Sequence, residues 1–206
     1  MLNIYLARHG QDEDNFNSIL NGHRNSPLTE LGQTQAQTLA AHIKEQGLSF
    51  EKIYASPLRR AHQTAQIVAA ALDYPEPTVE PDLIERDFGV MTGKKISEIE
   101  TLHPDEIFHS NGVTYFLSAE GSETLPEALE RAKGFLAKLR AAHPEGGNIL
   151  LVTHGDFSKM MFAAFYDLPW KEALQSFHFG NSELILLAPG LNPDEAHIFK
   201  VEQFNK

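Results

Sequence analysis

The chain has 206 residues, and its 17 Lys and Arg residues against 28 Asp and Glu residues give a formal net charge of −11 at pH 7. This acidic balance argues against nucleic-acid binding and against docking on anionic membranes, because both need clustered basic residues. The chain contains no cysteine, which excludes disulfides, thiol catalysis and thiolate-bound zinc. The length fits one domain, and we expect residues 1–206 to form it.

The sequence carries no pattern typical of a targeting or membrane-spanning segment. Its first residues lack the basic start and the long apolar run of a signal peptide. No segment approaches the roughly 18 consecutive apolar residues of a membrane span. We therefore expect a cytoplasmic protein that binds no membrane.

Predicted strands and helices alternate along the chain. Short apolar runs predict strands at residues 3–7, 52–55, 148–152, 183–188 and 197–202. Apolar residues at helical spacing predict helices at residues 31–46, 57–72, 125–142 and 157–166, with short helices near 96–102. This alternation predicts an α/β fold, a three-layer sandwich in which helices flank a mostly parallel central sheet.

Local signals set the boundaries of these elements. Thr29 and Ser56 are expected to cap the helices that follow them, and Thr124 with Glu127 forms a capping box. The polar residues 11–27 show no helical or strand period and predict a long loop. A loop of that length in a compact domain is usually functional.

Basic residues follow several predicted strands directly. Arg8 and His9 end the first strand, Arg59 follows the strand at 52–55, and His154 follows the strand at 148–152. Ligands of open α/β sheets bind beyond the carboxyl ends of the strands, so we expect these side chains to converge on an anion. Each one alone has a structural explanation, a hydrogen-bonded histidine or a solvated helix arginine. Arg60, beside Arg59, is expected to be such a solvated residue.

This set of residues suits phosphoryl transfer. A neutral imidazole can attack phosphorus and form a covalent phosphoenzyme, and arginines bind the phosphoryl oxygens bidentately. Glu85 could protonate the leaving oxygen if its pKa is raised. The chemistry requires no metal, and the 10 histidines show no His-x-x-x-His pair on a predicted helix. A P-loop motif is also absent.

Five segments in order resemble the histidine phosphatase superfamily, in its phosphoglycerate-mutase-like branch. They are residues 6–11 with Asn15, 27–33, 56–65, 83–89 and 152–155. The resemblance implies a phosphoglycerate-mutase-like fold in which His9 carries the phosphoryl group and Glu85 donates and accepts the proton. It implies that the phosphate is bound by Arg8, Asn15, Arg59 and His154. Secondary contacts are expected from Gly10, Gln11, Asn21, Gly22 and Gly155, with no metal.

Departures from the family pattern favour a phosphatase over a mutase. Phe88 and Asp156 stand where mutases of this family carry Tyr and Asn. Arg86 is the only arginine between Glu85 and Gly121, so the mutase arginine pair that holds a substrate carboxylate is missing. We expect a phosphomonoesterase that acts on a small phosphate ester without a cofactor. The alternatives are a mutase dependent on 2,3-bisphosphoglycerate and a catalytically silent module that binds a phospho-ligand.

Other features have no assigned role at this stage. Asp12 replaces the Thr or Ser that the family often has, near the expected phosphate. Residues 91–122 are expected to be an insertion that caps one end of the sheet and, with the loop at 23–26, sets specificity. Its aromatic residues could line an apolar site or form the core of the insertion: Phe108, Tyr115 and Phe116. The identity of the ester and the oligomeric state are not predicted.

Overall fold

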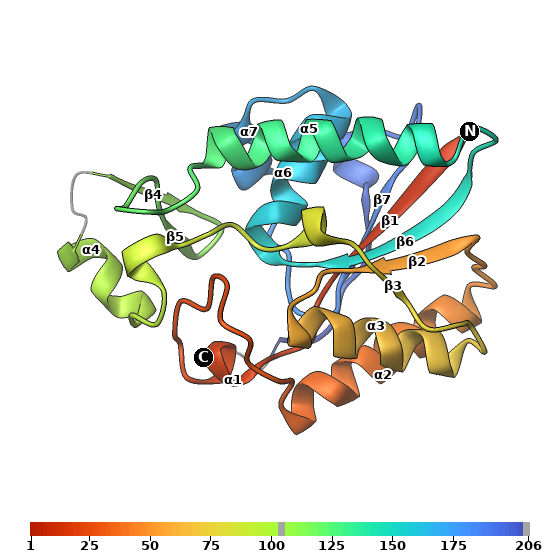
Figure 1. Cartoon of the computed structure of the whole chain (residues 1–206), viewed down its shortest axis with the longest axis horizontal. Coiled ribbons are helices and arrows are strands. Elements are labelled where there is room, and N and C mark those ends of the chain that lie inside the picture. Colours follow the sequence, from red (N-terminus) through yellow and green to blue (C-terminus); the bar gives the residue numbers. More distant parts are fainter. Residues whose placement is uncertain (103–105, 204–206) are drawn as a thin grey trace.

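A mixed six-stranded sheet forms the centre of the computed structural model, which describes residues 1–102 and 106–203 (Figure 1). The strand order is β3-β2-β6-β1-β7-β8. The parallel strands are β1 (Leu2–Arg8), β2 (Lys52–Ala55), β3 (Thr78–Val79) and β6 (Gly147–Thr153). Two antiparallel strands, β7 (Leu184–Leu187) and β8 (His197–Phe199), complete one edge. The predicted mostly parallel sheet is confirmed.

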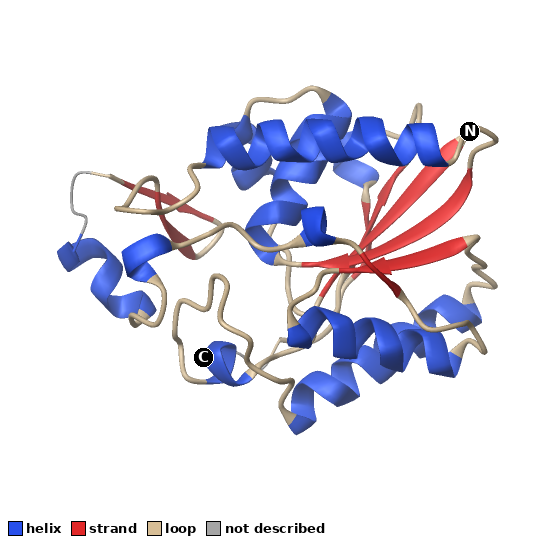
Figure 2. Cartoon of the chain, viewed as in Figure 1, coloured by secondary structure: helices blue, strands red, loops and turns tan. Residues whose placement is uncertain are grey.

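Helices cover both faces of this sheet, as Figure 2 shows. One face packs against α2 (Glu30–Glu45) and α3 (Arg59–Ala71), and the other against α5 (Leu125–Ala142), α6 (Gly155–Tyr166) and α7 (Trp170–Ser176). The apolar run of β1 supplies both cores because its side chains alternate. Ile4 and Leu6 join the α5–α6 core, whereas Tyr5 and Ala7 join the α2–α3 core. The predicted three layers are confirmed.

Helix caps agree with the sequence at two places and differ at a third. The Thr29 side chain caps α2 by accepting from Gly32 N, and Thr124 with Glu127 forms the predicted capping box of α5. The prediction that Ser56 caps α3 is wrong. This helix begins at Arg59 after Leu58, whose apolar side chain makes no cap. Ser56 is instead buried, and its Oγ atom lies 2.7 Å from Nε2 of His154, the residue that follows β6.

Several short elements were not predicted. The expected loop at 11–27 contains α1 (Glu13–Phe16), which Asp12 caps by accepting a hydrogen bond from Asn15 N at 2.7 Å. Within residues 91–122, the predicted short helices are confirmed as η3 (Ile96–Glu98) and α4 (Ile99–Leu102). The unpredicted elements there are a hairpin of β4 (Ile107–Ser110) and β5 (Val113–Phe116). The remaining 3-10 turns are η1 (Pro81–Leu83), η2 (Gly89–Met91) and η4 (Pro193–Glu195).

The 91–122 segment lies beyond the end of the sheet and has a small core of its own. Figure 1 shows α4, β4 and β5 together, away from the six-stranded sheet. Phe88, Met91, Ile99 and Phe116 form a buried cluster under them. Residues 103–105 of the segment lie outside the described part of the chain. Across that described part, the structure contains no helix with the length and hydropathy needed to cross a bilayer.

Two glycines bring the loop after β1 against the start of α2. A Cβ atom added at Gly32 would lie 2.0 Å from the carbonyl oxygen of Gln11. One added at Gly10 would lie 2.3 Å from the carbonyl oxygen of Gly32. Both obstacles are backbone atoms, so no side-chain rotation can relieve them. The path of the chain directly after His9 therefore depends on these two positions.

We expect Gly32→Ala to lower the free energy of unfolding by about 2 kcal/mol, because overpacking forces the backbone to shift. Gly134→Ala is the control, since an added Cβ at this exposed position of α5 meets no atom within 4 Å. It should stabilise the protein by up to about 1 kcal/mol through helix propensity. Denaturant unfolding of both variants measures the difference, and equal stabilities would contradict the close contact.

Candidate active site

His9 lies at the carboxyl end of β1 and is only 2% exposed. Its Nδ1 atom lies 2.7 Å from the carbonyl oxygen of Gly10, which can only accept a hydrogen bond. Nδ1 therefore carries the proton of the neutral ring. The opposite atom, Nε2, accepts a hydrogen bond from Nε of Arg60 at 3.2 Å. The two contacts together select the tautomer in which Nε2 has a free electron pair.

The charge state of the ring agrees with this tautomer. Burial lowers the pKa of His9 well below its usual value, and the positive charges of Arg60 and Arg8 lower it further. The ring of His154 lies 5.1 Å from that of His9, centroid to centroid. Burial also lowers the pKa of His154 well below its usual value, with Arg60 contributing next. Both imidazoles are therefore neutral near pH 7.

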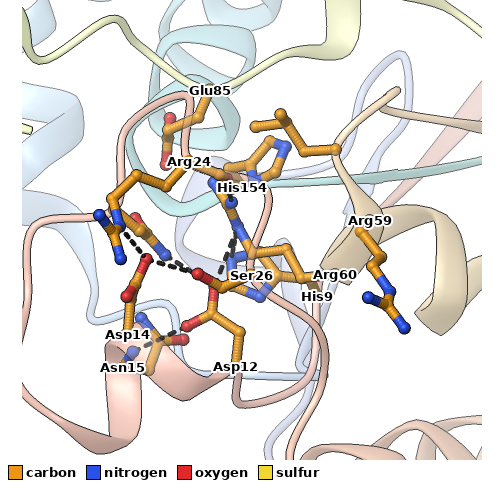
Figure 3. A network of polar contacts seen from close by, with 12 residues as sticks. His9, Asp12, Asp14, Asn15, Arg24, Ser26, Arg59, Arg60, Glu85 and His154 are labelled. Atoms are coloured by element: carbon orange, nitrogen blue, oxygen red, sulfur yellow. Dashed lines mark hydrogen bonds and ion pairs between the residues drawn. The ribbon is translucent and has the colours of Figure 1, made fainter. Parts of the chain in front are cut away.

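The guanidinium beside His9 belongs to Arg60 and not to Arg59. Arg60 is fully buried, so the prediction that it is a solvated helix residue is wrong. Arg59 is exposed, and Figure 3 shows its side chain directed away from His9. The guanidinium that was expected beside His9 at Arg59 is thus that of Arg60, one residue later. The reason is that adjacent residues of a helix such as α3 point about 100° apart, so Arg60 faces inward while Arg59 faces solvent.

A signal for Arg60 was present in the sequence. The buried face of α3 consists of Arg60, Ala61, Thr64, Ala65, Val68 and Ala69. The small and apolar members of this set recur at the helical spacing of three and four residues, and Arg60 is four residues before Thr64. Extending that spacing backward places Arg60 on the buried face and Arg59 on the solvent side.

Arg60 is held by four groups from two segments, residues 9–12 and 22–24, and Figure 3 shows it beside His9 and Asp12. Its Nε atom lies 3.3 Å from the Asp12 carboxylate in addition to its bond with His9. Its terminal nitrogens donate to the carbonyl oxygens of Arg24 at 2.7 Å and Gly22 at 2.9 Å. The carboxylate of Asp14 in turn accepts from Arg24 Nε, which fixes the loop that supplies these carbonyls. A buried guanidinium requires partners of this kind.

The other residues that were predicted to bind phosphate lie around the His9 ring. Nε2 of His154 forms a 2.7 Å hydrogen bond with Ser56 Oγ, while its buried Nδ1 has no partner among the described residues. Arg8 is oriented by donating from NH1 to the carbonyl oxygen of Phe179 at 2.6 Å. Asn181, which was not predicted, donates to the His9 carbonyl at 3.0 Å and to Asn15 Oδ1 at 3.1 Å. It ties the loop before β7 to the residues around His9.

Glu85 points toward the amino terminus of α6. Its Oε1 atom accepts from the backbone N–H groups of Arg86 at 2.8 Å and Phe157 at 3.0 Å, and its Oε2 atom from that of Asp156 at 3.3 Å. Burial nonetheless raises the pKa of Glu85, and the negative charge of Asp156 raises it further. The carboxyl group is oriented by fixed donors and keeps its proton to a higher pH than an exposed glutamic acid.

The five residues predicted to make secondary phosphate contacts do not all lie in one place. Asn21 and Gly155 line the cavity described below, and Gly22 contributes the carbonyl that binds Arg60. Gly10 donates its N–H to Thr64 Oγ1 at 3.0 Å. Gln11 is buried and donates its N–H to Gln35 Oε1 at 2.8 Å. These last two residues fix the backbone after His9.

A cavity of about 440 Å³ extends from this cluster toward the 91–122 segment. Its polar lining includes Arg8, Asn15, Glu85 and Lys159, and its apolar lining includes Leu20, Phe88, Ile96, Val113, Tyr115 and Phe116. Tyr115 and Phe116 thus serve both as lining and as buried core, whereas Phe108 packs beside Tyr115 and Trp170. Among the described residues, no cluster of three carboxylate or imidazole side chains is arranged to hold a metal ion.

Comparison with known proteins agrees with this geometry. The sequence pattern of the histidine phosphatase superfamily (branch 1) matches residues 4–195. The chain belongs to this superfamily. The uncharacterized phosphatase PhoE of Bacillus subtilis (strain 168) is 32% identical over 155 residues, which cover 75% of this chain and 72% of that protein. Phosphoglycerate mutase-like protein 4 of Arabidopsis thaliana is 33% identical over 162 residues, which cover 77% of this chain and 69% of that protein.

A solved structure shows the same fold. The mycobacterial glucosyl-3-phosphoglycerate phosphatase, in complex with VO3, aligns with a TM-score of 0.78 at 25% identity over 91% of this chain and 93% of that one. The fold and family predicted from the sequence are confirmed.

We expect Arg60→Lys to weaken the binding of inorganic phosphate about 10- to 100-fold, because a lysine cannot replace a guanidinium fork in a buried site. Arg59→Lys is the matched control and should leave the affinity unchanged, since the exposed side chain points away from His9. Isothermal titration calorimetry measures both, with melting temperatures to verify folding. A larger loss for the Arg59 variant would restore Arg59 as the phosphate ligand.

Proposed function

We propose that this protein is a phosphomonoesterase that transfers the phosphoryl group of a small ester to Nε2 of His9 and then to water. The observation that carries the proposal is the pair of hydrogen bonds on His9, which leaves Nε2 unprotonated in a buried site. The guanidinium that donates to Nε2 also places a phosphate-binding group directly beside the proposed nucleophile. Membership of the superfamily and the phosphatases among its relatives support the same activity.

In the first step, Nε2 of His9 attacks phosphorus and the bond between phosphorus and the ester oxygen breaks. The N–H of Arg60 that now donates to Nε2 can turn to a phosphoryl oxygen as the N–P bond forms. Arg8, Asn15 and His154 supply further groups around the same position. The unpartnered Nδ1 of His154 supports such a role, because a buried ring nitrogen usually has a partner.

Glu85 supplies the proton of the leaving group. Its raised pKa favours the acid form, which donates to the ester oxygen as the P–O bond breaks. The resulting carboxylate then takes a proton from water, the oxygen of that water attacks phosphorus, and the N–P bond breaks. Inorganic phosphate is released and His9 returns to its neutral form, so each group ends the cycle in its initial state.

Arg86 supports hydrolysis over the mutase reaction. Its Nε atom donates to Asp156 at 2.9 Å, and its NH1 and NH2 donate to the carbonyl oxygens of Glu123 and Phe116. The guanidinium also lies against the rings of Phe88 and Phe116. It is committed to the structure and is a poor ligand for a substrate carboxylate. A cofactor-dependent phosphoglycerate mutase needs such a ligand.

The cavity favours an ester whose alcohol part is at least partly apolar. Leu20, Ile96 and Val113 join the aromatic rings on its wall, and the 91–122 segment that carries several of them would act as a cap. We propose no metal and no cofactor, and 2,3-bisphosphoglycerate would be required only by the mutase alternative. The single domain, the cytoplasmic location and the lack of nucleic-acid and membrane partners stay predictions.

The test of this function is phosphate release from a panel of sugar phosphates, phosphoglycerates, nucleotides, phosphopeptides and aryl phosphates. We expect hydrolysis without added metal or 2,3-bisphosphoglycerate, and His9→Ala should lower kcat about 1,000-fold or more. Interconversion of phosphoglycerates that depends on 2,3-bisphosphoglycerate would favour the mutase. Binding of phosphate without turnover of any ester would favour the silent module.

We expect Glu85→Gln to lower kcat/KM about 100-fold or more for alkyl phosphates but less than about 10-fold for aryl phosphates, whose leaving groups need no proton. Because the pKa of Glu85 is raised, the wild-type enzyme should lose alkyl phosphatase activity as pH rises through that pKa. The aryl substrate shares the titration of the phosphate and is the internal control. Equal losses for both substrates would exclude Glu85 as the acid.

A further inference from the structure

Asp12 is a fully buried carboxylate next to the arginine that contacts His9 (Figure 3). Its Oδ2 atom lies 3.3 Å from Arg60 Nε and accepts a hydrogen bond from Asn21 Nδ2 at 2.8 Å. Its Oδ1 atom caps α1 through Asn15 N. A Thr or Ser, which the family often has here, could provide the cap without a charge. The carboxylate therefore adds a negative charge that the cap of α1 does not require.

Two further arginines near the site are also paired with carboxylates. Arg24 is paired with Asp14 at 2.9 Å and Arg86 with Asp156 at 2.9 Å. Burial lowers the pKa of Lys159, which also lines the cavity, to about 7, so this amine carries only part of a positive charge near neutral pH. Arg24, Arg60 and Arg86 thus each face a carboxylate, whereas Arg8 donates to the carbonyl oxygen of Phe179.

We propose that Asp12 is a specificity-determining residue, whose buried charge offsets that of Arg60 so that the site accepts esters carrying one phosphate and no second anionic group. The inference rests on the proposed function in that the site must bind phosphate. Charges that are buried together are little screened by salt, so the repulsion from Asp12 reaches the ligand. The repulsion grows with the total charge of the ligand, because Coulomb energy is proportional to the product of the charges. A bisphosphate is therefore disfavoured more strongly than inorganic phosphate.

Calorimetric binding of inorganic phosphate and of 2,3-bisphosphoglycerate tests this role without requiring turnover. For Asp12→Asn we expect the Kd of phosphate to fall about threefold and that of the bisphosphate about tenfold or more. Glu13→Gln is the matched control, since it removes the same charge from the adjacent exposed position and should change neither Kd. Asp12→Ser, whose hydroxyl can still cap α1, serves as a second variant if the amide perturbs folding.

The wild-type protein gives an independent measurement that needs no variant. We expect it to bind 2,3-bisphosphoglycerate no more tightly than inorganic phosphate, despite the larger charge of the bisphosphate. Bisphosphate binding by the wild type that is more than about tenfold tighter would overturn the proposal. The proposal would also be overturned if the Asp12 variants bound the two ligands with unchanged or lower affinity. It would be overturned too if the affinities for phosphate and bisphosphate changed by the same factor. Failure of the wild type to hydrolyse any ester would refute the proposed function and leave the binding comparison intact.

Discussion

The burial of one guanidinium, that of Arg60, organises the whole candidate site. A charged group without access to water requires hydrogen bonds and an opposite charge, and their removal leaves a large uncompensated cost. Arg60 finds these partners in His9, Asp12 and the carbonyls of Gly22 and Arg24. All four follow β1 in the chain, while Arg60 belongs to α3. These four contacts therefore fix the polar residues 9–24 against α3.

This constraint explains why a segment without regular period is ordered. Asp12 begins α1, and Asp14 accepts from both Arg24 Nε and Ser26 Oγ. These hydrogen bonds bend the chain so that the Gly22 and Arg24 carbonyls face α3. On the other side, the close approach of Gly10 and Gly32 leaves no freedom for the backbone after His9. His9 is thus held by backbone geometry and by the neighbouring buried ion pair of Arg60 and Asp12.

The sequence was sufficient for the layers and for most of the cluster, and insufficient where tertiary contacts decide. Apolar runs predicted the strands that end at His9 and His154, and the alternation of strands with helices predicted the layers around them. Motif order alone did not separate Arg59 from Arg60; only the helical spacing of the buried residues of α3 places Arg60 on the inner face. Nor could residue spacing predict α1, because this helix is a single turn stabilised by its cap, the buried Asp12.

The placement of carboxylates changes the expectation drawn from the net charge of −11. That charge argues against nucleic acid and membranes, whereas the basic residues after the strands were expected to converge on an anion. The guanidiniums of Arg60, Arg24 and Arg86 each face a carboxylate at 3.3 Å or less. The histidines beside them have lowered pKa values and are neutral. Arg8 instead donates to the carbonyl oxygen of Phe179, so in the proposed reaction its charge and the fixed direction of the other N–H donors would together hold the phosphoryl group.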